Sequence, residues 1–279
     1  ILKKGADGNI VEMDSGIGAV TSIDIDSIGN LYFGVNEPDL IKFIKLTPDG
    51  SVSTLADDYS FTRIDAVHVV GSGKVYVGQA ANIAIVDTSS GSVSLLFENG
   101  VVQGDVLGIA VGNQGETYFT SADPDNSLSK LYKADADSTI TELAENTLFG
   151  TITDLDIDAN SNLIFPSLTE TYQTIYQLDT KGNVLQLTDL LLYPYGVDVD
   201  ANGAIYYVTL AGGKVHKLTP TRIEARPTNT EVGIHKDICV IVSDGNSDVE
   251  ECFTLTVTNV NDAPVIGGMP DSMVAQGVK

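Results

Sequence analysis

Five short segments of the sequence carry one variable residue between two apolar ones, and the variable residues could bind a metal. They are Asp24, His68, Ala110, Asp156 and Asp198. Alternation along a strand places the variable and the apolar side chains on opposite faces. If the five strands surround a common axis, three carboxylates and one imidazole converge there. Clustered carboxylates favour a hard cation such as Ca²⁺, which is the candidate cofactor, whereas a histidine favours a transition metal.

The same pattern has a structural interpretation, which stays open. An aspartate on an inner strand can lie in a water-filled channel or accept a hydrogen bond from the backbone of a neighbouring strand. The sequence contains no nucleophile elbow, no His-Glu-x-x-His segment and no Cys–His pairing. Asp26, Asp158 and Asp200 are expected to cap their own turns.

The elements that must position these residues form a repeat. Each copy has an apolar strand, a tight polar turn and a second strand with an aromatic or apolar residue, and its last residue recurs after 42 to 46 residues. The copies are 22–32, 66–76, 108–118, 154–164 and 196–206. A second hairpin follows, as in 44–55 with its Asp49-Gly50 turn. Four short strands with a period of 40 to 50 residues are typical of a β-propeller blade, which predicts an all-β fold.

The two ends of the repeat region are complementary. Residues 1–14 match the third and fourth strands of a repeat, and the fifth copy has no fourth strand. An unpaired blade edge promotes aggregation, so a ring has to close. We therefore expect five four-stranded blades, with the N-terminal strand completing the last one. The alternative is a six-bladed ring whose remaining strands lie upstream of Ile1.

Residues 1–219 resemble the NHL-type, gluconolactonase-like and streptogramin-lyase-like propellers. The resemblance implies the propeller fold and leaves the activity open. Lactonases and lyases of these families hold a metal and catalytic groups near the axis. The usual Glu-Asn-Asn-Asp metal set of the gluconolactonase-like families has no counterpart here. The catalytic histidine of the lyases has one axial candidate, His68.

The chain after Pro220 differs from the repeats. Segments 226–235, 243–245 and 259–264 resemble the last strands of bacterial cadherin-like, Ig-like adhesion repeats. We expect a propeller at 1–220, a partial β-sandwich module at 221–266, and the start of a next repeat or a disordered tail at 267–279. The resemblance implies calcium ligands at this junction, although the family's leading aspartate is an asparagine here. The matching positions are Asp244, Asn259, Asn261 and Asp262.

The tail contains the two cysteines of the chain. A turn at Gly245-Asn246 places Cys239 directly opposite Cys252 on a hairpin. Such a pair can form a cross-strand disulfide in an oxidising compartment. Two buried thiols, or a shifted register, are the alternatives.

Charge limits the classes of partner. The chain has 15 Lys and Arg against 38 Asp and Glu, a net charge of −23. This argues against nucleic acid and against an anionic membrane surface. Hydrophobic residues make up 43% of the chain, which is enough for a packed core. The longest apolar run ends at Pro194 and cannot span a membrane.

We expect a non-catalytic ligand-binding or adhesion module of a secreted or cell-surface bacterial multidomain protein, with the propeller as the recognition scaffold. Its partner would be an unidentified protein or carbohydrate, without nucleic acid or membrane insertion, and the chain would be a monomer. The alternative is a metal-dependent lactonase-like or lyase-like enzyme with its site at the axis.

Overall fold

The computed structural model describes most of the chain. The described residues are 1–4, 10–12, 18–38, 40–71, 73–97, 101–123, 128–144, 149–169, 173–188, 191, 193–218, 229–243 and 248–258. The chain divides into two compact units, residues 1–220 and 221–279. Among the described residues there is no helix of the length and apolarity that a transmembrane span requires.

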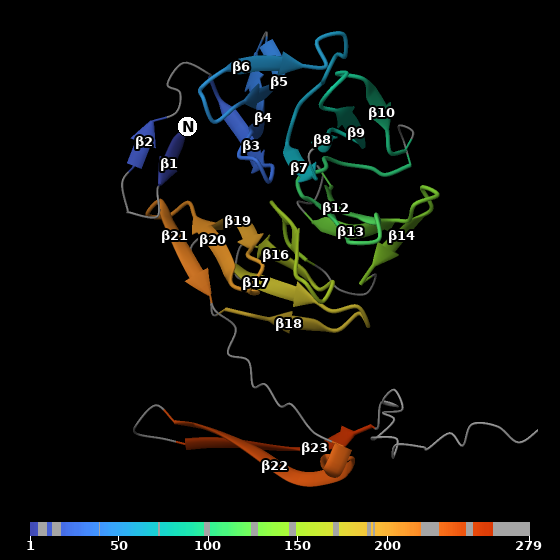
Figure 1. Cartoon of the computed structure of the whole chain (residues 1–279), viewed down its shortest axis with the longest axis vertical. Coiled ribbons are helices and arrows are strands. Elements are labelled where there is room, and N and C mark those ends of the chain that lie inside the picture. The colour runs from blue at the N-terminus through green and yellow to red at the C-terminus, as the bar shows by residue number, and fades with distance from the viewer. Residues whose placement is uncertain are drawn as a thin grey trace, which may run out of the picture. The chain divides into compact units, whose positions relative to one another are not determined.

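The first unit is a ring of five antiparallel sheets around a common centre (Figure 1). The first blade comprises β3 (Val20–Ile25), β4 (Leu31–Glu37), β5 (Leu40–Leu46) and β6 (Val52–Leu55). The second comprises β7 (Ala66–Val70), β8 (Lys74–Gln79), β9 (Asn82–Asp87) and β10 (Val93–Leu95). The third comprises β11 (Ile109–Val111), β12 (Thr117–Ala122), β13 (Ser129–Ala134) and β14 (Ile140–Leu143). The fourth comprises β15 (Asp156–Ile157), β16 (Leu163–Leu168), β17 (Gln173–Leu178) and β18 (Val184–Gln186), and the fifth β19 (Pro194–Val199), β20 (Ile205–Thr209) and β21 (Lys214–Leu218).

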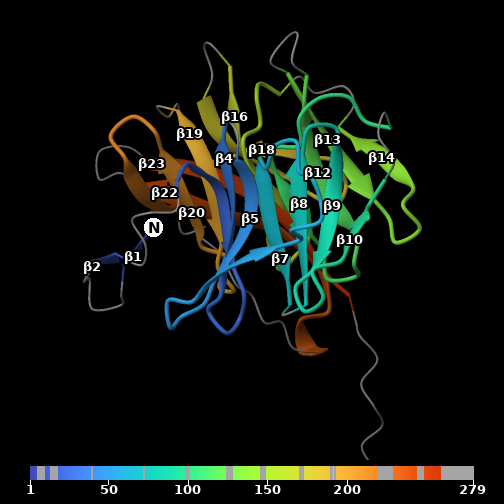
Figure 2. The same ribbon diagram turned by 90° about the horizontal axis from the view of Figure 1, so that it is seen from above.

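Each blade follows chain order from its innermost to its outermost strand, so consecutive strands pair as hairpins. Figure 2 shows the paired strands β8 and β9 of the second blade running side by side. The turn between the first two strands is closed by an aspartate, as the turn sequence predicts. The Asp26 carboxylate accepts hydrogen bonds from the Ile28 and Asn30 backbone N–H groups at 3.1 and 2.8 Å. Gly29 follows with φ 89°, a left-handed conformation that favours glycine.

Apolar side chains of adjacent blades pack into separate clusters. Phe43 of the first blade packs with Val75 and Val77 of the second, and the other clusters join the later blades in the same way. Aromatic pairs mark these contacts, such as Phe149 edge-on to Phe165 with ring centroids 5.0 Å apart. The predicted all-β propeller with five blades is confirmed.

The predicted closure of the ring is corrected by the strand pairing. Among the described residues, β1 (Leu2–Lys4) pairs with β2 (Ile10–Glu12), and the fifth blade has three strands. The hairpin lies between the fifth and the first blades in Figure 1. Ile1 packs against the apolar cluster of the first blade, which contains Phe33 and Val35. This contact with the first blade takes the place of the predicted pairing with the fifth.

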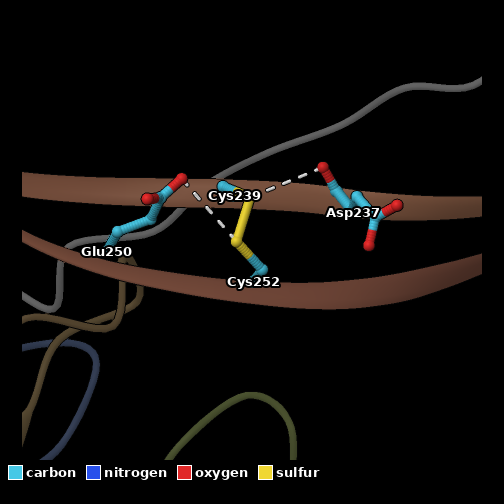
Figure 3. The surroundings of a disulfide bond; sticks show 4 residues. All are labelled: Asp237, Cys239, Glu250 and Cys252. Atoms are coloured by element: carbon cyan, nitrogen blue, oxygen red, sulfur yellow. Dashed lines mark hydrogen bonds between the residues drawn. A yellow bond between two sulfur atoms is a disulfide. The ribbon is translucent and has the colours of Figure 1, made fainter.

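The second unit contains a 3₁₀ turn, η1 (Asn229–Glu231), and a hairpin of β22 (Gly233–Ser243) and β23 (Asp248–Val257). Cys239 and Cys252 occupy opposed positions in this hairpin, with Cα atoms 4.0 Å apart, and form a disulfide (Figure 3). The bond lies where a turn at Gly245-Asn246 places it. The cadherin-like identity of this unit stays a prediction.

Candidate functional site

Two predicted axial aspartates bind the backbone of the neighbouring blade. The Asp24 Oδ2 atom accepts a hydrogen bond from the N–H of Val69 at 2.7 Å, and its Oδ1 atom accepts one from the N–H of Ile25 at 2.7 Å. Asp156 on β15 does the same toward β19, with its Oδ2 atom 2.6 Å from the Val199 nitrogen. These carboxylates therefore join consecutive inner strands at their otherwise unpaired edges.

A second row of side chains, two residues earlier in each inner segment, repeats this device. Asp154 accepts a hydrogen bond from the Val197 N–H at 2.9 Å, and the Ser22 hydroxyl accepts one from the Val67 N–H at 2.9 Å. Asp154 was not among the predicted axial residues. Its equivalents in the other repeats are Ser22, Ala66, Gly108 and Gly196, so its carboxylate was the one sequence signal that could have identified it.

The joint between the third and fourth blades uses no such acceptor. A Cβ atom on Gly108 would lie 2.7 Å from the Asp154 carbonyl carbon and 2.8 Å from the Leu155 nitrogen, so the two inner segments approach closely there. The Leu155 and Ile157 N–H groups instead donate to the carboxylates of their own preceding aspartates, at 2.9 and 2.8 Å.

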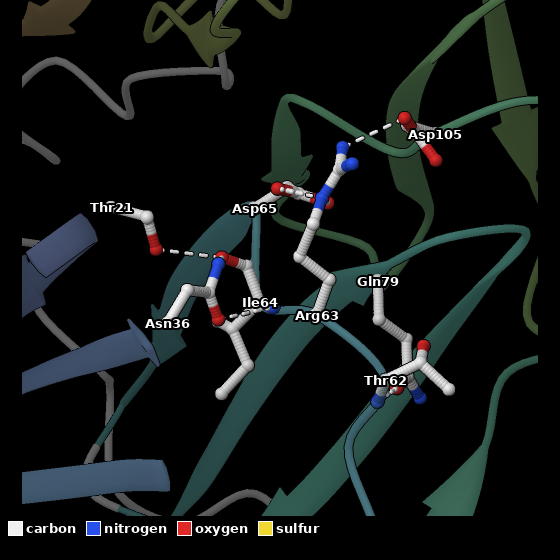
Figure 4. Close-up of polar contacts among 8 residues, drawn as sticks. All are labelled: Thr21, Asn36, Thr62, Arg63, Ile64, Asp65, Gln79 and Asp105. Atoms are coloured by element: carbon white, nitrogen blue, oxygen red, sulfur yellow. Dashed lines mark hydrogen bonds and ion pairs between the residues drawn. The ribbon is translucent and has the colours of Figure 1, made fainter. Parts of the chain in front are cut away.

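Polar and charged groups also join the first three blades nearer their ends (Figure 4). Ile64 donates its N–H to the Asn36 Oδ1 atom at 3.0 Å, and its carbonyl accepts hydrogen bonds from Asn36 and Thr21 at 2.8 and 2.6 Å. The Arg63 guanidinium contacts Asp65 at 2.6 Å and Asp105 at 2.7 Å. These hydrogen bonds and ion pairs hold the blades against one another.

Burial changes the protonation of the inner carboxylates. It raises the pKa of Asp154 and of Asp156 to about 7, against the hydrogen bonds that each accepts from the backbone. Burial also raises the pKa of Asp24, which the backbone hydrogen bonds and His68 oppose. Groups that exchange a proton near neutral pH are found both in active sites and in structural networks.

His68 and Asp24, two of the predicted axial residues, lie close to each other. The His68 Nδ1 atom lies 3.7 Å from the Asp24 Oδ2 atom, and both side chains are partly exposed. Burial lowers the pKa of His68, while the Asp24 and Asp198 charges oppose that effect. The imidazole is therefore neutral near pH 7, the form in which it can accept a proton.

No three of the four predicted axial ligands have ligand atoms within 4.8 Å of one another. In the described part of the chain, the one group of three or more His, Cys, Asp or Glu ligand atoms within 4.8 Å of one another is Cys239, Glu250 and Cys252, whose thiols are joined in the disulfide. Asp198 is exposed on β19. The axial metal site stays a prediction. The adhesion-junction candidates Asp244, Asn259, Asn261 and Asp262 lie outside the described residues.

A cleft of about 650 Å³ lies between the third and fourth blades and was not predicted from the sequence. Tyr118 and Lys133 line it from the third blade, with Asp135 2.8 Å from the lysine Nζ atom. Burial raises the pKa of Tyr118, and the Glu116 carboxylate raises it further. Glu116, Ser161 and Asp179 also line the cleft.

Five blades with polar groups along their inner strands define a β-propeller. Proteins of this fold differ in function because they carry different sites on the same scaffold. The family described as the SMP-30/Gluconolactonase/LRE-like region matches residues 40–231. The chain therefore belongs to this family. A comparison with curated proteins gives no significant match.

Proteins of the same fold whose structures are solved have different functions. A catalytically inactive virginiamycin B lyase from Staphylococcus aureus with quinupristin is 17% identical, with a TM-score of 0.57, 88% of this chain covered and 82% of the other. A gluconolactonase from Xanthomonas campestris is 16% identical, with a TM-score of 0.56 and coverage of 70% and 71%. The nidogen/laminin complex is 16% identical, with a TM-score of 0.58 and coverage of 72% and 76%. These likenesses show the fold alone.

Proposed function

We propose that this chain is a non-catalytic recognition module of a secreted or cell-surface bacterial protein, and that it binds a carbohydrate-like, polyhydroxylated ligand in the cleft between the third and fourth blades. It acts as a monomer and takes neither nucleic acid nor membrane as a partner. The cadherin-like tail would belong to the same adhesion function, with Ca²⁺ at its junction. The acidic surface and the Cys239–Cys252 disulfide support a location outside the cytoplasm.

The cleft is the observation that carries this proposal. Its volume lies within the range of small-ligand sites. Tyr118 offers an amphipathic ring, suited to the apolar face of a sugar. Glu116, Asp135 and Asp179 offer hydrogen-bond acceptors for hydroxyl groups, and Lys133 offers donors. Three carboxylates and one ammonium disfavour an anionic ligand.

The inner carboxylates support the non-catalytic part of the proposal. Asp24, Asp154 and Asp156 are each engaged by two backbone N–H groups. A carboxylate held in this way holds two strands together, which is the structural interpretation of the axial pattern. The nidogen/laminin complex shows that a protein of this fold can be part of a protein–protein complex.

The test is a glycan array probed with the labelled full chain, followed by titration calorimetry of the glycans that bind. Tyr118→Ala should weaken binding by at least about tenfold, because the stacking surface is lost. Tyr76→Ala is the matched control, since Tyr76 occupies the same repeat position and is likewise packed against a core cluster. Equal affinity of the two variants, or no glycan bound, would overturn the proposal.

A second function is favoured by the contact between His68 and Asp24. Under this hypothesis, His68 is a general base, oriented by Asp24, in a lactonase-like or lyase-like reaction. The solved virginiamycin B lyase is a histidine-to-alanine variant described as catalytically inactive. A screen of lactones and cyclic depsipeptides, with and without divalent metal, tests this function. Turnover that His68→Ala abolishes would establish it, and the same turnover in His68→Ala would exclude His68 as the base.

A further inference from the structure

The first, third and fifth blades share a set of three side chains: a tyrosine, a lysine and an acidic residue. The tyrosine on the second strand lies opposite the lysine on the third strand, in the pairs Tyr32–Lys45, Tyr118–Lys133 and Tyr206–Lys217. The tyrosine hydroxyl donates to a carboxylate of the preceding turn. The acceptors are Asp26, Glu116 and Asp200, at 3.2, 3.4 and 3.3 Å.

In the first and fifth blades the lysine places its ammonium group over the tyrosine ring. The Lys45 Nζ atom lies 5.6 Å from the ring centroid of Tyr32, and the Lys217 Nζ atom lies 4.9 Å from that of Tyr206. A cation in this position is attracted both by the face of the ring and by the carboxylate beside the hydroxyl. These two blades therefore supply the cation from their own chain.

The third blade differs because its lysine is engaged elsewhere. The Lys133 Nζ atom lies 2.8 Å from the Asp135 Oδ1 atom, and among the described residues no ammonium group lies over the Tyr118 ring. Tyr118, Lys133 and Asp135 all line the cleft between the third and fourth blades. The blade whose ring lacks a cation is thus the one that opens into a cleft.

The carboxylate beside Tyr118 is also less occupied than its equivalent in the first blade. Asp26 is buried and accepts four hydrogen bonds, whereas Gly112 takes its place in the third blade. A Cβ atom on Gly112 would lie 2.5 Å from the carboxyl carbon of Glu116, so the Glu116 side chain folds over this glycine. Its half-buried carboxylate accepts two hydrogen bonds from described residues, from the Gln114 N–H and the Tyr118 hydroxyl. Glu116 can therefore accept further donors.

We propose that the cleft binds the protonated amine of an amino sugar, as in an oligosaccharide of glucosamine, with the ammonium group over the Tyr118 ring and beside Glu116. This inference rests on the proposed function and names the class of its polyhydroxylated ligand. The amine of the ligand takes the place that the Lys45 and Lys217 ammonium groups take in the first and fifth blades. Three carboxylates against one ammonium group in the cleft also favour a cationic ligand.

The test compares two oligosaccharides that differ at the amine. The full chain is titrated calorimetrically with the tetramer of glucosamine and with the tetramer of N-acetylglucosamine. Measurement at about pH 6 keeps the free amines protonated, and about 0.15 M NaCl screens their general attraction to the acidic surface. We expect the glucosamine tetramer to bind at least about tenfold more tightly.

Glu116→Gln should weaken binding of the glucosamine tetramer by at least about fivefold, because the charge beside the amine is lost. It should change binding of the N-acetylated tetramer by less than about twofold. Asp200→Asn is the matched control, because it removes the carboxylate beside Tyr206, where Lys217 already supplies the cation. This variant should change both affinities by less than about twofold.

Asp135→Asn tests whether Lys133 competes for the same place. Without its partner, the Lys133 ammonium group can move over the Tyr118 ring, so binding of the glucosamine tetramer should weaken by at least about fivefold. Adding Lys133→Met to this variant should restore most of the affinity. A double variant that binds as weakly as Asp135→Asn would overturn the proposal.

The remaining outcomes separate this inference from the function on which it rests. Equal affinity for the two tetramers, or equal losses in Glu116→Gln and Asp200→Asn, would overturn the amine preference and leave carbohydrate binding in place. Tetralysine bound as tightly as the glucosamine tetramer would show that charge alone is recognised, and would overturn the inference as well. If neither tetramer nor any glycan of the array binds, both the inference and the proposed function fall.

Discussion

The carboxylate of Asp154 lies between the N–H groups of Leu155 and Val197, each 2.9 Å away, in surroundings that raise its pKa to about 7. Its unfolded-state pKa is near the ordinary value of 3.8. Between these two values the native state binds more protons than the unfolded state. Asp154 and Asp156 therefore lower the free energy of unfolding as the pH rises from about 4 to about 7.

Asp154→Asn should flatten this dependence. The amide oxygen can still accept a backbone N–H, whereas the titration is removed. Between about pH 4.5 and 7.5, the unfolding free energy of the natural chain should fall by roughly 3 kcal/mol more than that of the variant. Urea unfolding at several pH values measures the difference.

Ser22→Ala is the control for this experiment, because the Ser22 hydroxyl accepts the equivalent N–H of Val67 at 2.9 Å and carries no charge. The unfolding free energy of this variant should change with pH as that of the natural chain does. Parallel curves for the Asp154→Asn variant and the natural chain would show that Asp154 does not titrate in this range.

At this scale the sequence predicted the residue types and left open whether their side chains face the axis or bind the backbone of a neighbouring strand. Asp24 and Asp156 lie on inner strands, as the alternation indicates. They point toward the next blade because each blade packs face to face with its neighbour, and no local pattern encodes that contact. Asp154 was missed for the same reason, since its partner Val197 lies 43 residues away.

Among the elements, the inner segment of the third blade is tightly constrained by the fourth. Gly108 has no room for a Cβ atom, because the backbone of Asp154 and Leu155 lies 2.7–2.8 Å from its position. A methyl group there would force the inner segments of the third and fourth blades apart. Packing between these blades also involves Ala110 and Ile152, which are fully buried.

Gly108→Ala should therefore destabilise the propeller by roughly 2 kcal/mol or more. Gly73→Ala is the control for the same chemical change, since Gly73 lies in the turn between β7 and β8 of the second blade, with no atom within 4 Å of a Cβ and no left-handed backbone. Thermal unfolding followed by circular dichroism compares the two. Similar midpoints for the two variants would mean that the inner segments of the third and fourth blades can move apart without loss of stability.

The elements themselves were predictable because their signals are local. Alternating apolar residues and Asp-x-x-Gly turns define each hairpin within about a dozen residues. The closure of the ring was not predictable, since Ile1 packs on the first blade instead of extending the fifth. The cleft was missed as well, because its lining residues extend from Gln114 to Gly182 and meet only in the folded ring.

The whole molecule carries a net charge of −23, so its surface carboxylates repel one another. Added salt screens this repulsion more effectively in the compact state than in the expanded unfolded chain. Raising NaCl from about 0.05 to 0.5 M should raise the unfolding midpoint by roughly 3–6 °C.

Calorimetry with EDTA present checks this prediction and removes divalent cations as the cause. KCl should act like NaCl, because screening depends on ionic strength and hardly on the identity of the cation. A midpoint that stays constant, or falls, with either salt would show that charge repulsion does not limit stability.

The joints of the ring differ from one another, with aspartates at two of them and Gly108 at a third. A blade is therefore adapted to its own two neighbours and not to a general position in a series. Recombination that duplicated, deleted or reordered these repeats would place an aspartate against a strand whose N–H groups already have acceptors. It could also place a side chain against a backbone that leaves no space for it. The copies look alike in sequence, yet their order along the chain is fixed by how each one meets the next.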